Sequence, residues 1–362
     1  MNRPAARTSI GMAAAAAGLV AASVSFADDA NEYAARSELD RSATTSPAQP
    51  VSSRDLLALR DRAIEMLVEM SASETPQVRA NAIEGLEGAP NRLEPIVALG
   101  VLDGNAGVRA VSLMVAGRQR FSAQAGPART NLHDPSAFVQ AAALFALKRF
   151  GQDIDLTPLA TMLLEDPEPA VRAHAAFILG ELGEESALGM LRQANARQMP
   201  RAGQAQLAVM RLQFAEAMVK LGDDDQIHTL HAALFPSRPE DLEAAALAAQ
   251  ILGEVGGRRS IPDLINLAIQ QDERGNHMPA EVRLAAARSV AKLGRTDGEF
   301  IAHEYASSDN AAIRAQVAMV YAETLDRDGL DALTAMLDDP DEMVRVAAAA
   351  GLLRAVNRIR GN

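Results

Sequence analysis

Two histidines and an aspartate come nearest, by type and spacing, to a metal site. His228 and His231 lie three apart and Asp224 lies four before His228, so a helix would place all three on one face. Imidazole and carboxylate groups are common ligands of transition metals. However, residues 223–225 are all Asp and follow Gly222, where acidic residues favour the first turn of a helix. Because protein metal sites normally have three or four ligands with supporting partners, we predict neither a metal nor another cofactor.

An arginine recurs directly after a valine-like position along most of the chain. The arginines are Arg79, Arg109, Arg172, Arg211, Arg283, Arg314 and Arg345. Gln140 and Ala245 replace the arginine in two copies. The row could be an anion-binding stripe, or each arginine could donate to a turn aspartate or a carbonyl of a neighbouring copy. The second interpretation is favoured, because this position flanks an apolar helical face and the planar guanidinium suits carboxylates.

Three large apolar residues, Met114, Phe145 and Phe177, occupy one position in successive copies of the same pattern. They could form an apolar strip that binds a partner segment on the concave wall of a repeat array. Alternatively they are ordinary core, because inner helices of such arrays are buried on more than one side. The core interpretation is favoured, and the partner-binding strip is kept as a hypothesis.

A second partner-binding hypothesis concerns three longer connecting segments, residues 197–203, 236–239 and 272–279. They carry Arg201, Arg238 and Arg274, which would make one edge of the array less acidic than the rest. Insertions at one place in a repeat gather on one edge, which is frequently the binding edge. The alternative is that these segments are solvated connections without a role in binding.

No sequence motif for catalysis is present. The chain has no nucleophile elbow, no phosphate-binding loop and no zinc motif. Triad residues can be dispersed along a sequence, so this observation disfavours an enzyme without excluding one. We therefore name no catalytic residue and expect a protein that is not an enzyme.

The arginines and apolar residues belong to a pattern that recurs through most of the chain. Its valine-like position lies at Val78, Val108, Val139, Val171, Met210, Ala244, Val282, Ile313 and Val344. The intervals run from 30 to 39 residues, so nine units stand in tandem. Such a period is typical of a repeat array in which each unit buries its apolar face against its neighbours.

Each unit reads as two helices. In the clearest copy, apolar residues fall at 171, 175, 178, 179 and 182, which is one face of a helix. A glycine follows at 183, as at 151, 222, 256 and 294, where a left-handed residue ends a helix. Asp-Pro pairs at 134, 166 and 339 suit an N-cap followed by a first-turn proline. Shorter amphipathic segments such as 156–164 supply the first helix, so the fold class is all-α.

Residues 166–183 follow, with small variations, the pattern Asp-Pro-x-x-x-Val-Arg-x-x-Ala-Ala-x-x-Leu-Gly-x-Leu-Gly. This pattern resembles the short HEAT repeats of the phycobilisome-lyase type. The resemblance covers about Arg54 to Arg360. It implies a right-handed α-solenoid, or superhelix, with the second helices on the concave side, and it implies interaction scaffolding more than an activity.

The domain organisation has three parts. Residues 1–27 read as a secretory signal peptide, with Arg3 and Arg7 before an apolar stretch and a Ser-Phe-Ala cleavage site at 25–27. Residues 28–53 are rich in Ser, Thr and Pro and read as a flexible linker. Residues 54–362 form the repeat solenoid. Charged residues in the segment 54–67 and in the last helix favour capping helices with a solvated outer face at both ends.

We expect an exported protein of the periplasm or the extracellular space, without stable membrane insertion after signal cleavage. Its net charge of −12 disfavours nucleic acid as a partner. The expected function is a non-enzymatic scaffold or adaptor that binds a protein or peptide through the concave face or the loop edge. The alternative is a lyase-like or chaperone-like accessory protein that handles a prosthetic group.

Overall fold

The computed structural model describes residues 52–271 and 274–361. All the secondary-structure elements in these residues are helices, apart from one isolated bridge between Gln271 and His277. The signal peptide predicted at 1–27 and nearly all of the linker predicted at 28–53 lie outside these residues. Within them the helices form nine hairpins. The first helices are α2 (Ser53–Met70), α4 (Pro90–Gly100), α6 (Ala125–Asn131), α8 (Thr157–Glu165), α10 (Leu188–Ala196), α12 (Ile227–Ala233), α14 (Ile261–Ile269), α16 (Glu299–Tyr305) and α18 (Arg327–Met336). The second helices are α3 (Pro76–Gly85), α5 (Ala106–Gln119), α7 (Ala137–Arg149), α9 (Pro169–Leu182), α11 (Gln204–Lys220), α13 (Leu242–Val255), α15 (Ala280–Lys292), α17 (Ala311–Thr324) and α19 (Glu342–Arg360).

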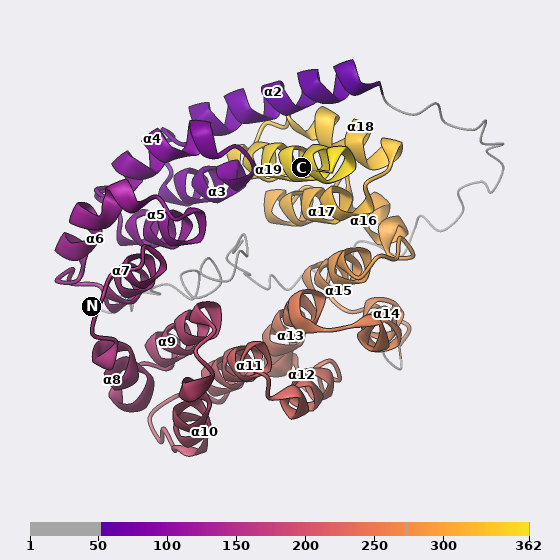
Figure 1. Ribbon diagram of the computed structural model, residues 1–362. Helices are drawn as coiled ribbons and strands as arrows, with labels where there is room; N and C mark the ends of the chain where they lie inside the picture. The colour runs from indigo at the N-terminus through magenta and orange to yellow at the C-terminus, as the bar shows by residue number, and fades with distance from the viewer. Residues whose placement is uncertain (1–51, 272–273, 362) are drawn as a thin grey trace, which may run out of the picture.

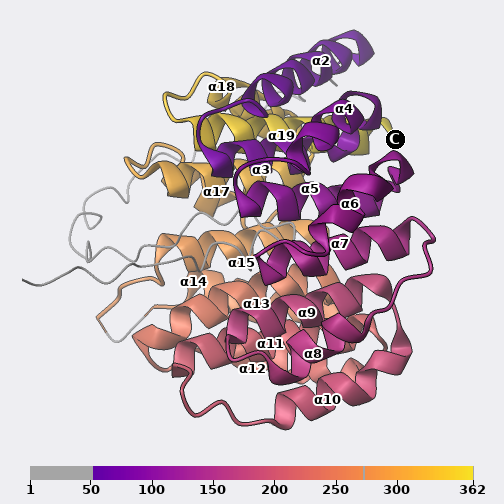
Figure 2. The same cartoon turned by 90° about the vertical axis from the view of Figure 1, so that its left-hand side faces the viewer.

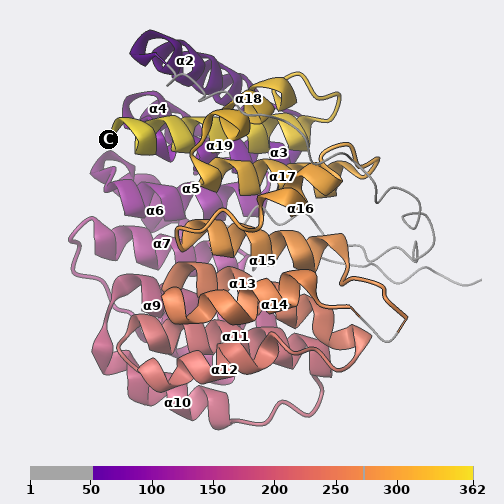
Figure 3. The same ribbon diagram turned by 90° about the vertical axis from the view of Figure 1, so that its right-hand side faces the viewer.

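The hairpins stand side by side around a ring, with the second helices inside and the first helices outside (Figure 1). Figure 2 presents the wall formed by α4 to α10, and Figure 3 presents the opposite wall formed by α12 to α18. The predicted all-α solenoid is thereby confirmed, and the second helices lie on the concave side as expected.

Burial differs sharply between the two layers. In the outer helix α8 only Leu159 and Leu163 are buried, which fits an amphipathic helix that packs on one face. In the inner helix α9 Pro169 and every residue from 171 to 180 are buried. The apolar period predicted one buried face for this helix, whereas two neighbouring inner helices and its own outer helix cover most of its circumference. Small residues such as Ala175 and Ala176 make this close packing possible.

The helix ends follow the sequence signals only in part. Asp134, Asp166 and Asp339 were predicted as N-caps, but α7, α9 and α19 begin three residues after them. Each aspartate instead accepts a hydrogen bond of 2.9 Å from the backbone N–H two residues later, within the turn that precedes the helix. Of the predicted terminating glycines, those at 151, 183, 222 and 294 have left-handed φ values between 72° and 91°. Gly256 does not, because its backbone is extended with φ −76°.

The two ends of the array meet. Helix α19 packs against both α2 and α3, so the last repeat contacts the first. Arg60 Nε donates to Asn357 Oδ1 at 3.1 Å, and Asn357 Nδ2 donates to the carbonyl of Gly88 at 2.9 Å. The prediction of solvated capping helices at both ends was therefore wrong, because the last helix covers the face that the first repeat would otherwise expose. The solenoid closes into a ring and does not continue as an open superhelix.

Candidate functional site

The recurring arginine forms the predicted structural ladder. The Arg79 guanidinium donates two parallel hydrogen bonds of 2.9 Å to Asp103, which lies in the turn of the next repeat. Arg109 pairs with Asp134 and Arg314 with Asp339 in the same bidentate geometry, at 2.8–3.0 Å. In all three arginines Nη1 also donates to backbone carbonyls of its own turn. The hydrogen-bond donors of these guanidinium groups are used within the fold, so the three arginines do not form a free anion-binding stripe.

The ladder changes where the sequence departs from the pattern. Gln140, which replaces an arginine, donates to the carbonyl of Asp134 at 2.7 Å. Arg172 donates to the carbonyl of Asp166 at 2.6 Å, and no aspartate of the next turn faces it because the segment 197–203 replaces the usual turn. Arg283 binds Glu304 at 2.8 Å and the Tyr305 hydroxyl at 2.7 Å. The irregular contacts of Arg172 and Arg283 therefore lie beside the longer connections 197–203 and 272–279, whereas that of Gln140 on α7 does not.

The predicted apolar strip is part of the core. Met114, Phe145 and Phe177 are exposed by only 1%, 1% and 5%. Phe145 packs so closely on α5 that a Cβ added at Gly117 would lie 2.6 Å from its ring. Lys220 Nζ lies 5.1 Å from the centroid of the Phe177 ring. An exposed apolar wall is not formed by these three side chains, and their contact with a partner stays a prediction.

The three loop arginines are exposed, as the loop-edge hypothesis requires. Arg201, Arg238 and Arg274 each lie between the first and second helices of their repeats. Arg238 forms a bidentate pair with Asp241 at 3.0 and 3.2 Å, which offsets its charge. The loop edge is thus less basic than the arginines alone suggest, and its role in binding stays a prediction.

His231 contacts residues of the next repeat and not the histidine and aspartate considered as metal ligands. Its Nδ1 lies 2.6 Å from Asp263 Oδ2, and its Nε2 lies 3.0 Å from Ser260 Oγ. This is the contact order of a Ser–His–Asp triad, which the sequence did not reveal because the three residues come from separate elements. In a catalytic triad the serine is accessible and the aspartate is buried. Here Ser260 is only 1% exposed, whereas the Asp263 side chain is 39% exposed. The contacts therefore join α12 to α14 and leave the serine inaccessible.

Charged side chains on, or directly after, neighbouring second helices pair with one another. The pairs are Glu87–Arg118, Glu181–Lys220, Glu254–Lys292 and Glu323–Arg354, which we call the inner-face ion pairs. Lys220 Nζ lies 2.7 Å from carboxylate oxygens of both Glu181 and Glu216. Burial raises the pKa of Glu216, an effect that the Lys220 ammonium group partly offsets. Burial likewise raises the pKa of Glu84, beside Arg118, to about 7.

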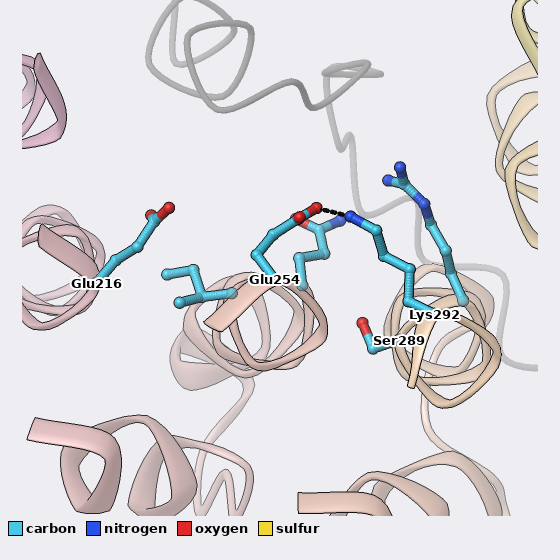
Figure 4. A pocket seen from close by; sticks show the side chains of 7 residues that line it. Glu216, Glu254, Ser289 and Lys292 are labelled. Carbon is cyan, nitrogen blue, oxygen red and sulfur yellow. Dashed lines mark hydrogen bonds and ion pairs between the residues drawn. The ribbon is translucent and has the colours of Figure 1, made fainter. Parts of the chain in front are cut away.

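A shallow hollow lies among three of these second helices, α11, α13 and α15 (Figure 4). Its open volume is about 330 Å³, solvent at its mouth included. The lining residues are Glu216, Gln250, Ile251, Glu254, Arg288, Ser289 and Lys292. Figure 4 shows Glu254 and Lys292 reaching toward each other across the boundary between α13 and α15, where they form an ion pair. All the lining residues come from inner helices, so the hollow belongs to the inner face of the ring.

Arg288 differs from Lys292, the other cation in the lining. It is 7% exposed, and its Nε is buried without a hydrogen-bond partner among the residues that the structure describes. Burial lowers the pKa of Arg288 to about 10, and the charge of Arg354 adds to this effect. Its Nε–H group is therefore a buried donor without a partner in the lining of the hollow.

Sequence reasoning missed the inner-face ion pairs, although a signal for them was present. The tenth residue after the valine-like position is charged in eight successive units, beginning at Arg118 and ending at Arg354. From Glu181 onward the sign alternates at every unit. Alternating charges at one repeat position indicate contacts between neighbours, because equivalent residues of stacked units lie side by side.

No catalytic or metal centre emerges from the described ranges. They contain no group of three or more His, Cys, Asp or Glu residues placed to hold a metal ion. Within them, no helix combines the length and apolar character needed to cross a membrane.

The sequence profile described as HEAT repeats matches residues 126–209 and 273–353. These two regions contain HEAT repeats, as the resemblance predicted; the phycobilisome-lyase subtype stays a prediction. No curated protein has a sequence that matches the chain.

Several solved structures are similar at low identity. Human deoxyhypusine hydroxylase in complex with glycerol is 18% identical, with a TM-score of 0.36 over 84% of this chain and 98% of that chain. An engineered protein is 16% identical, with a TM-score of 0.32 over 84% and 92%. Kap121p is 10% identical, with a TM-score of 0.29 over 77% and 39%. Scores this low assign neither an activity nor a partner to this chain.

Proposed function

We propose that this chain is an exported, non-enzymatic scaffold that binds a segment of a protein partner on the inner face of its ring. HEAT-repeat solenoids are typical of protein-interaction scaffolds. The observation that carries the proposal is the row of inner-face ion pairs, which places polar groups from successive repeats along one continuous surface.

The chemistry of that surface suits an extended polar segment more than an apolar one. Met114, Phe145 and Phe177 are buried, so the corresponding places on the inner helices offer little apolar area. The Glu181–Lys220 and Glu254–Lys292 pairs are partly exposed, and such pairs are individually weak, so their members can exchange partners with an incoming peptide at small cost. Recognition is then spread over several repeats, as is usual for the concave surfaces of solenoids.

Site-specific photo-crosslinking tests the surface. A photoreactive residue is placed on the inner face at Lys292, on the loop edge at Arg201, or on the outer helix α4 at Leu99, which is 75% exposed. Crosslinking is carried out in the native cell envelope, and adducts are identified by mass spectrometry. We expect one protein to be enriched from position 292 over position 99. Adducts from position 201 alone would move the binding surface to the loop edge and refute the inner-face proposal.

The export part of the proposal rests on the sequence at 1–27. Expression of the full chain in a bacterial host should yield an exported protein whose N-terminal residue is Asp28, measured by mass spectrometry of the purified chain. Recovery of uncleaved chain in the cytoplasm would contradict it.

A further inference from the structure

Helix α15 carries two buried arginines with opposite surroundings. Arg283 is 2% exposed, and its guanidinium donates to the Ala268 carbonyl, Glu304 and Tyr305 at 2.7–3.0 Å. Arg288 is 7% exposed, and its buried Nε has no hydrogen-bond partner in the described ranges. A buried cation without a partner is strongly unfavourable, whereas a satisfied one is tolerated. The contacts of Arg283 account for its burial, whereas no contact within the described ranges accounts for the burial of the Arg288 Nε.

The surroundings of Arg288 are polar and face the hollow. Ser289, from the same helix, and Gln250, from α13, line it and can both donate hydrogen bonds. The other lining cation, Lys292, is already paired with Glu254. The positive charge available to a ligand in the hollow is therefore that of Arg288.

These groups favour a singly charged anion. A guanidinium offers a planar fork that matches a carboxylate through two parallel hydrogen bonds. Phosphate would fit the fork as well, but it carries up to two negative charges and would lie beside the Glu216 and Glu254 carboxyl groups that line the same hollow. A carboxylate satisfies Arg288 with less repulsion from these neighbours.

We propose that Arg288, assisted by Gln250 and Ser289, binds an aspartate or glutamate side chain of an acidic partner segment that lies along the inner face. The inference rests on the proposed function, since the carboxylate belongs to the scaffold's partner. It adds the chemistry of the partner segment and the residue that anchors it.

The test uses a blocked pentapeptide with two glutamates, a matched peptide with two glutamines, and inorganic phosphate, all at constant ionic strength. Binding to the full chain is measured by calorimetry and by the ¹⁵N resonance of the Arg288 Nε–H group, which is assigned from its absence in Arg288→Met. We expect the glutamate peptide to shift this resonance and the glutamine peptide to leave it unmoved. A response to phosphate but not to the glutamate peptide would overturn the proposal.

Variants separate a ligand site from a structural role. Arg288→Met should weaken binding of the glutamate peptide about tenfold or more. Arg358→Met, which removes a cation paired with Glu323 on α17, is the matched control and should change binding less than Arg288→Met. Equal losses in the two variants would indicate general electrostatics and refute the site.

The melting temperature of the free protein supplies an independent readout. Arg288→Met should leave it unchanged or raise it, because the substitution removes an unsatisfied buried charge, whereas Arg283→Met should lower it. A fall in melting temperature of similar size in both variants would assign Arg288 to the structure alone. The same conclusion would follow if Arg288→Met did not fold while Arg288→Lys folded and bound the glutamate peptide as the wild type does.

The two proposals can fail separately. Crosslinks from position 292 together with unchanged binding by Arg288→Met would refute the carboxylate anchor and leave the scaffold intact. Peptide binding that depends on Arg288, with no crosslink from position 292 in the envelope, would support the anion site and refute the proposed scaffold function.

Discussion

His174 makes the stability of the ring dependent on pH in a defined direction. The imidazole is 2% exposed on α9, lies 5.1 Å from the Phe138 ring centroid and 6.3 Å from that of Phe177, and has no hydrogen-bond partner among the described residues. Burial lowers its pKa from 6.5 to about 4. Protonation therefore favours the unfolded chain, in which the imidazole is hydrated.

The magnitude follows from the two pKa values. Above about pH 6.5 the imidazole is neutral in both states and contributes no pH dependence. As the pH falls from about 6.5 to about 4 the unfolded state binds a proton that the folded state refuses, so the free energy of unfolding decreases. One pKa unit corresponds to about 1.4 kcal/mol, and the full loss is therefore about 3 kcal/mol. Below about pH 4 both states are protonated and the loss stops growing.

The assay is urea unfolding of the wild type and His174→Leu at half-unit steps from pH 7.5 to pH 4. The stability difference between the two proteins should shift in favour of the variant by about 3 kcal/mol across this range. Phe145→Leu is the control, because it perturbs a buried ring of α7 without removing a titrating group, and its profile should run parallel to that of the wild type. Parallel profiles for wild type and His174→Leu would refute the reasoning.

Two further substitutions probe the ladder and the closure of the ring. Asp134→Asn should lower the free energy of unfolding, measured by urea titration, by about 1–3 kcal/mol, because it weakens a half-buried bidentate pair with Arg109. Asp338→Asn removes a carboxylate from an exposed pair and should lower it by less than about 1 kcal/mol. Gly85→Val should open the ring and increase the radius of gyration in small-angle scattering, since even a Cβ at this position would lie 2.8 Å from the Ala350 Cβ across the closure.

The controls for these variants are present in the chain. Gly189→Ala adds a Cβ that meets nothing within 4 Å and should leave the scattering unchanged. An unchanged radius of gyration for Gly85→Val would mean that the contact between α3 and α19 adapts without opening. Equal effects of Asp134→Asn and Asp338→Asn would contradict the distinction between ladder pairs and surface pairs.

The repeat units were predictable because each carries its own local signals. The position of Val171, its apolar period and Gly183 are enough to place α9, since the same residues pack against equivalent residues in the neighbouring units. The aspartate of the turn was misread as an N-cap because its backbone contact two residues later resembles capping. For Asp134 and Asp339, the bond to an arginine one repeat earlier was anticipated from the match of guanidinium and carboxylate.

The closed ring and the hollow could not be predicted in the same way. Arg60 and Asn357 lie 297 positions apart, and their meeting depends on small rotations summed over all nine units. No single unit encodes that sum. The unpaired state of Arg288 likewise depends on which carboxylates its neighbours occupy, and Glu254 and Glu323 are both taken by other cations.

The contact between α19 and α2 also sets an order of events during folding. Among the described helices α2 is the first along the chain and α19 the last, so the surfaces that join them are far apart until the hairpins between them have stacked. Those hairpins can stack independently of the ends, because each needs only its neighbour. The junction of first and last repeats is then the final folding step, and until that step the array is an open arc whose inner helices can be approached from the side. A partner segment present at that stage would be enclosed as the ring closes, without any need for the finished ring to reopen.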